Sequence, residues 1–82
     1  MPYVKPDRRS GLDPVVDAMI EADVQADGDL NYILFKFARH IQPSYDRLKN
    51  YRAELRECAD EIKRRMLDPY EDRKIQENGD VY

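Results

Sequence analysis

Apolar residues recur at helical spacing in three stretches of the chain, and glycine or proline separates each stretch from the next. Steps of three and four residues place side chains on one face of a helix. In the first stretch these positions are Val16, Met19, Ile20 and Val24. The pair Asp13-Pro14 is typical of a helix start. Gly28 is typical of the residue that directly follows a helix end. The pattern therefore predicts a helix over residues 13–27.

The second stretch is the most apolar part of the chain. Its helical positions are Leu30, Ile33, Leu34, Phe37 and Ile41, and Tyr32 and Phe35 widen this apolar surface. Asp29 can cap the start of this segment, and Pro43 ends it because proline has no amide donor. We expect a helix over residues 29–42 that forms the central and most buried element.

The third stretch is the longest and predicts a helix over residues 45–67. Ser44 can cap its start, and Pro69 is expected to stop it. Its apolar positions alternate between steps of three and four, as in a coiled-coil seam: Leu48, Tyr51, Leu55, Cys58 and Ile62. The pattern falters at Arg65, where Met66 takes over. A helical hairpin on the second helix, or a bundle between copies, therefore fits better than an autonomous coiled coil.

Neither end of the chain shows apolar periodicity. Residues 1–12 hold two prolines, a glycine and a basic cluster, and we expect an arm there. Residues 69–82 are polar, although Glu71 and Asp72 favour a short helical turn by placing negative charge at its N-terminus. The expected organisation is all-α: one three-helix domain over residues 13–68 between the arm and the tail.

A chain of 82 residues can bury only about 60% of the surface that its unfolded form exposes. Small domains usually compensate with disulfides, a metal or oligomerisation. Cys58 is the one cysteine, and together with His40 it cannot supply the four ligands of a structural zinc site. We therefore expect a homo-oligomer whose shared core uses the following residues: Ile33, Leu34, Phe37, Leu48, Tyr51, Leu55 and Ile62.

The net charge of −3 is unevenly distributed, because residues 13–29 carry six acids and no base. A basic footprint for nucleic acid is absent, which argues against such a partner. No apolar run approaches the roughly 20 residues of a membrane span, and no secretory pattern opens the chain. With a single cysteine, the expected compartment is the cytoplasm.

The best candidate for a ligand pocket lies near the end of the third predicted helix. Arg64 and Arg65 suit phosphate groups, and Tyr70 can stack on a nucleobase. Lys36 and Arg39 add positive charge if the second helix ends nearby. Together these residues suggest an anionic, nucleotide-like ligand. The alternative is that the cations only stabilise a helix C-terminus, as we also expect for His40.

Carboxylates supply the one enzymatic alternative. Glu54, Glu57 and Glu61 fall on one side of the third helix, and Glu21 lies on the first. Carboxylates from packed helices can hold Mg²⁺, as in helical nucleotide pyrophosphatases of the MazG type, although the doubled-glutamate motif is absent here. Ordinary pairing with the interleaved arginines explains the same pattern without a metal. No other cofactor is expected.

Several segments of the chain carry a resemblance to known sequences: Pro69-Tyr70-Glu71-Asp72, Lys74-Ile75, Glu77-Asn78-Gly79-Asp80-Val81-Tyr82, Glu61 with Arg64-Arg65, Leu12-Asp13-Pro14 and Leu30-Asn31-Tyr32. In these segments the chain resembles a family of short uncharacterised proteins from bacteriophages and prokaryotic genomes. This resemblance assigns no catalytic residue. It implies a non-enzymatic accessory protein of phage or prophage type that binds a host protein or sequesters a small signalling nucleotide.

Overall fold

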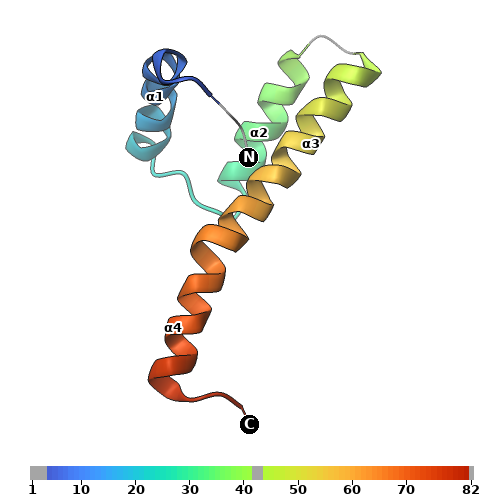
Figure 1. Cartoon of the computed structure of the whole chain (residues 1–82). Helices are drawn as coiled ribbons and strands as arrows, with labels where there is room; N and C mark the ends of the chain where they lie inside the picture. Colours follow the sequence, from blue (N-terminus) through green and yellow to red (C-terminus); the bar gives the residue numbers. More distant parts are fainter. Residues whose placement is uncertain (1–3, 42–43, 82) are drawn as a thin grey trace. The chain divides into compact units, whose positions relative to one another are not determined.

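The computed structural model describes residues 4–41 and 44–81, and every regular element within them is a helix (Figure 1). In chain order these elements are α1 (Pro6–Glu21), α2 (Asp29–His40), α3 (Tyr45–Ile62), the π-helical turn η1 (Lys63–Leu67) and α4 (Asp68–Asn78). The predicted all-α class is therefore confirmed. The chain divides into a unit Tyr3–Lys49 and a unit Asn50–Tyr82. Each unit is described by itself.

In the unit Tyr3–Lys49, α1 starts earlier than the sequence predicts. Pro6 occupies its first turn, where a missing amide hydrogen costs nothing, and the Lys5 carbonyl accepts the N–H of Arg8 at 3.0 Å. Pro14 lies inside the helix and not at its start. The Ser10 carbonyl that Pro14 leaves without a helical donor belongs to an exposed residue and is open to water. The predicted arm is thus wrong for residues 6–12.

The predicted end of the first helix is also wrong, because the backbone turns at Asp23. This residue has φ 54°, and its N–H donates to the Ile20 carbonyl at 3.0 Å. The next residue, Val24, donates to the Met19 carbonyl at 3.2 Å. The two bonds form a Schellman motif, which more often has glycine at the left-handed position. That preference explains why the sequence pointed to Gly28 instead.

Gly28 is in fact the N-cap of α2. Its φ of 132° is a conformation that side chains disfavour, and its carbonyl accepts the N–H of Tyr32 at 2.9 Å. The helix starts at Asp29, as predicted, but the predicted cap at Asp29 is wrong: its carboxylate accepts the N–H of Gln25, in the preceding loop, at 3.2 Å. This bond ties the preceding loop to the helix start. The predicted helix end at residues 42 and 43 lies outside the described residues.

Among the described residues of this unit, no side chain is buried. On α2, Ile33 and Leu34 are half-buried, whereas Phe37 is 56% exposed. Leu48, near the start of α3, is also exposed. The structure therefore places the predicted central helix at a surface, and its apolar positions do not close a core within the unit.

In the unit Asn50–Tyr82, the ribbon passes from α3 into α4 without a break (Figure 1). The predicted stop at Pro69 is therefore wrong. Residues 69–78 of the predicted tail belong to α4, so the helix here is longer than the short turn expected at Glu71 and Asp72. In a regular α-helix the ring of Pro69 would clash with the carbonyl four residues earlier. Here the wider turn η1 precedes it, and the Asp68 N–H bonds to the Lys63 carbonyl five residues back. The Lys63 ammonium also lies 3.2 Å from the Asp68 carboxylate.

Two features of α3 complete the fold. The hydroxyl of Ser44 accepts the N–H of Arg47 at 3.1 Å, which confirms the predicted cap. Tyr51 is half-buried, and Leu55 and Ile62 are exposed. The described part of this unit contains no buried side chain either.

None of the described helices is long and apolar enough to cross a membrane.

The Schellman motif at Asp23 can be tested by substitution. A β-branched residue is strained in the left-handed conformation, so Asp23→Val is expected to lower the free energy of unfolding by about 1–2 kcal/mol. Glycine adopts this conformation freely, so Asp23→Gly is the matched control and should change it by less than about 0.5 kcal/mol. Urea unfolding followed by circular dichroism measures both. Equal destabilisation by the two variants would show that the side chain of Asp23 matters and its backbone conformation does not.

Candidate functional site

A hollow of about 400 Å³ follows one side of α2. Its lining residues are spaced at helical intervals and so share a face: Gly28, Asn31, Tyr32, Phe35, Lys36 and Arg39. They combine two aromatic rings, two cations and one amide. The set includes two of the five ligand residues that the sequence predicted, Lys36 and Arg39.

The side chains of this hollow are open to solvent and carry positive charge. Tyr32 and Phe35 are each 64% exposed. The Lys36 ammonium donates to the Tyr32 hydroxyl at 3.3 Å and lies 5.4 Å from the centre of the ring. Within the described part of the chain, neither Lys36 nor Arg39 pairs with a carboxylate. The hollow can therefore offer both cations to an anion and both rings to an aromatic group.

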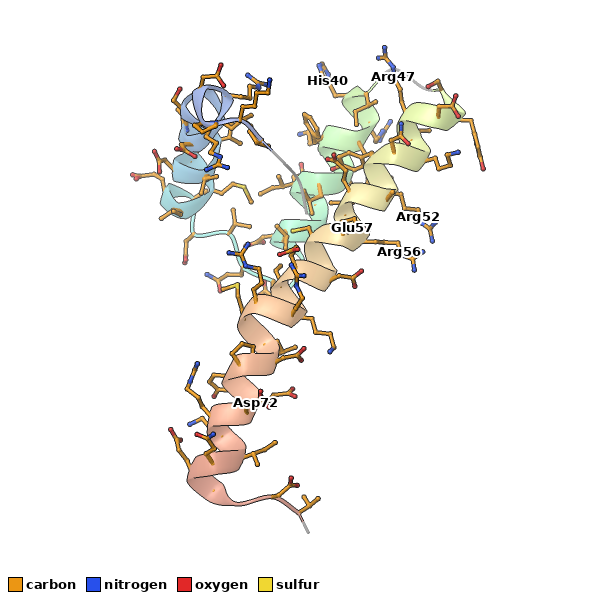
Figure 2. All side chains as sticks on the ribbon, in the orientation of Figure 1. His40, Arg47, Arg52, Arg56, Glu57 and Asp72 are labelled. Atoms are coloured by element: carbon orange, nitrogen blue, oxygen red, sulfur yellow. The ribbon has the colours of Figure 1, made fainter. Side chains whose placement is uncertain are left out.

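His40, the last residue of α2, follows Arg39 and extends from that end of the helix (Figure 2). Both residues lie where a cation interacts favourably with the helix dipole. This geometry agrees with the structural role expected for His40. It also places Arg39 at the same end of α2, one turn after Lys36.

The other three predicted ligand residues belong to the unit Asn50–Tyr82, where Arg64 and Arg65 share one carboxylate. A guanidinium nitrogen of Arg64 donates to Glu61, and Arg65 Nη1 lies 3.6 Å from Glu61 Oε2. The hydrogen bond from Arg64 is the main cause that holds the pKa of Glu61 below its ordinary value of 4.5. The charges of both arginines act in the same direction, and partial desolvation opposes them.

The ring of Tyr70 lies beside two other cations. The Arg73 guanidinium lies 5.9 Å and the Lys74 ammonium 5.6 Å from the centre of its ring. Lys74 also pairs with Glu77 at 3.3 Å. The sequence thus identified an aromatic residue near cations, and the cations over its ring are Arg73 and Lys74. The pocket of Arg64, Arg65 and Tyr70 stays a prediction.

The alternative metal site finds no support within one copy. In the described ranges, no group of three or more histidine, cysteine, aspartate or glutamate side chains is arranged to hold a metal ion. Glu61 is engaged by two arginines, as described above, and Glu21 belongs to a different unit from Glu54 and Glu57. Mg²⁺ binding by these four carboxylates stays a prediction.

Sequence reasoning missed the aromatic half of the α2 hollow. Tyr32 and Phe35 were interpreted only as apolar surface, and Gly28 only as a helix end. The signal was nevertheless present, because Tyr32, Phe35, Lys36 and Arg39 follow one another at steps of three, one and three residues. Two aromatic rings followed by two cations on one helix face suit a ligand that combines an aromatic group with negative charge.

The sequence of residues 1–81 matches the family described as "Domain of unknown function (DUF6899)", and the chain belongs to that family. No curated protein and no solved structure matches it. The expectation of an uncharacterised family is thereby confirmed. The bacteriophage origin and the C-terminal motif stay predictions.

The ion pairs of Glu61 predict a pH dependence of stability. Since the pKa of Glu61 in the folded chain is below 4.5, its contribution is present above pH 4.5 and is lost as the pH falls through the folded-state pKa. Glu61→Gln should therefore flatten the decline of the thermal midpoint between pH 6 and pH 3, as followed by circular dichroism. Glu77→Gln is the control, because the Glu77–Lys74 pair is largely exposed and contributes little. An unchanged pH profile in Glu61→Gln would contradict this role.

Proposed function

We propose that this member of the DUF6899 family is a homo-oligomeric helical binding protein without catalytic activity, and that its ligand is an anionic, nucleotide-like molecule held on α2. The observation that carries the proposal is the α2 hollow, where two exposed rings lie beside two cations that have no carboxylate partner in the described chain. A cation without an acidic neighbour attracts an anion more strongly than one that is already paired.

Each class of side chain in the hollow matches one part of a nucleotide. Lys36 and Arg39 suit phosphate oxygens, since both donate charge-assisted hydrogen bonds. Tyr32 and Phe35 suit the base, because an aromatic ring stacks on any nucleobase. The amide of Asn31 can both donate and accept hydrogen bonds at a base edge. This combination favours a phosphate joined to an aromatic ring over inorganic phosphate alone.

Self-association is supported by the surface that one copy exposes. No described side chain is buried, and large apolar residues of α1, α2, α3 and α4 face solvent. A small helical chain gains most of its stability from packing of apolar faces, so a second copy is the direct source of the missing contacts. Pockets between helices of such an assembly are typical ligand sites.

Other expectations from the sequence are consistent with this proposal, but no feature of the described structure bears on them. A bacteriophage origin, a host protein as partner and a cytoplasmic location belong to this group. Mg²⁺-dependent hydrolysis by Glu54, Glu57 and Glu61 is the competing function. It needs carboxylates that converge, which the described residues of one copy do not provide.

Calorimetric titration with a nucleotide panel tests the ligand. Nucleoside mono-, di- and triphosphates should bind, whereas the uncharged nucleoside should bind much more weakly. The double variant Lys36→Gln/Arg39→Gln should lose about tenfold or more in affinity, as expected for the loss of charged hydrogen bonds. Lys49→Gln is the matched control: Lys49 lies over Tyr45 at 5.4 Å, the same distance that separates Lys36 from Tyr32, but outside the hollow.

Three results would contradict the proposal. One is the absence of binding by the folded wild-type protein. Another is an equal loss in Lys49→Gln, which would indicate a general charge effect. The third is release of phosphate or pyrophosphate in the presence of Mg²⁺, which would favour the hydrolase. If the folded protein binds no nucleotide but captures one defined host protein, the nucleotide is excluded as the ligand. The hypothesis that the protein binds a host protein is then retained.

A further inference from the structure

An exposed apolar stripe runs along the helix of the unit Asn50–Tyr82. It consists of Cys58, Ile62, Met66 and Tyr70, which follow one another at four-residue steps. Ile62 is 51%, Met66 66% and Tyr70 51% exposed, and Cys58 is also exposed. We call this set the assembly stripe. Its members are evenly spaced about a midpoint at residue 64. The spacing is therefore the same whether the stripe is followed from the N-terminus or from the C-terminus.

The π-helical turn η1 keeps the stripe on one face of the helix. In a regular α-helix each four-residue step overshoots a full turn by about 40°, so three such steps would rotate Tyr70 by about 120° away from Cys58. Between Lys63 and Asp68 the backbone bond spans five residues, and this wider turn removes part of that rotation. The change of spacing at Arg65 in the sequence therefore coincides with a change of helix type.

The stripe contains a hollow with the geometry of a coiled-coil hole. The hollow measures about 300 Å³ and is lined by Cys58, Glu61, Ile62, Arg65 and Met66. The first four of these residues stand at positions i, i+3, i+4 and i+7, which is the set that receives an apolar knob from a facing helix. Glu61 Oε2 is buried there without a hydrogen-bond partner in the described chain, since Arg65 Nη1 is 3.6 Å away.

On one flank of the stripe the charged residues change from acidic to basic along the helix, although Asp72 stands next to Arg73. Glu54, Glu57 and Glu61 lie on its flank toward the N-terminus, and Arg65 and Arg73 continue the same flank toward the C-terminus. Arg52 and Arg56 do not belong to this series, and both extend from another side of α3 (Figure 2). If two copies ran parallel, like charges would meet. If they run antiparallel, the acidic end of each flank meets the basic end of the other.

We infer that a second copy of this chain covers the assembly stripe in antiparallel orientation, with a two-fold axis close to Arg64. This arrangement places Cys58 of one copy opposite Tyr70 of the other, and Ile62 opposite Met66. Met66 then fills the hollow between Cys58, Glu61, Ile62 and Arg65. The inference rests on the self-association proposed above, and it specifies the surface and the orientation.

Disulfide cross-linking distinguishes the orientations. In an antiparallel pair the two copies of Cys58 are about 18 Å apart along the helix, too far for a disulfide. Mild oxidation should therefore leave wild type uncross-linked on a non-reducing gel. Tyr70→Cys should give a disulfide-linked dimer, because the new thiol faces Cys58 of the other copy. Cys58→Ser/Tyr70→Cys is the control and should give no dimer, since its two thiols are again about 18 Å apart.

Light scattering and circular dichroism of the same samples separate the possible failures. A wild-type dimer linked through Cys58 would show parallel pairing and overturn the inference. A helical, multimeric Tyr70→Cys variant that does not cross-link would place the interface elsewhere and leave the proposed self-association intact. A helical monomer at all concentrations would contradict both the inference and the proposed homo-oligomer.

Discussion

A helix with an apolar face is stable in water only when that face packs against something, and this constraint governs the whole chain. Within the described residues no side chain is buried, although rings of α2 and the stripe of α3 and α4 are apolar. The α2 hollow and the assembly stripe both result from this shortage of buried apolar contacts. The hollow combines its rings with two cations that pair with no carboxylate in the described chain, and it suits a ligand. One flank of the stripe is acidic toward the N-terminus and carries Arg65 and Arg73 toward the C-terminus, and it suits a second copy.

The fold class could be predicted from the sequence because apolar spacing of three and four residues is specific to helices. The helix ends were predicted less well, because they depend on backbone hydrogen bonds that the residue types do not determine. Pro14 and Pro69 were interpreted as boundaries, but each lies inside a helical stretch. The true turn after α1 is at Asp23, whose left-handed conformation depends on two backbone hydrogen bonds. Residue identity alone does not specify such bonds.

The candidate site was predicted in part, for an electrostatic reason. A sequence identifies cations but not their partners. Lys36 and Arg39 remain available in the described structure, whereas Arg64 and Arg65 share the carboxylate of Glu61. The π turn was likewise visible in the sequence only as a fault in the heptad pattern at Arg65. Its meaning depends on the five-residue backbone bond that the structure supplies.

We propose that one copy cannot bury its own apolar side chains, and the dependence of thermal unfolding on protein concentration decides this. For an assembly, mass action raises the unfolding midpoint with protein concentration. Circular dichroism melts across a hundredfold concentration range should therefore show a midpoint that increases steadily by several degrees. A sharp, cooperative transition whose midpoint does not change with concentration would show that a single copy is stable alone, and it would contradict the account.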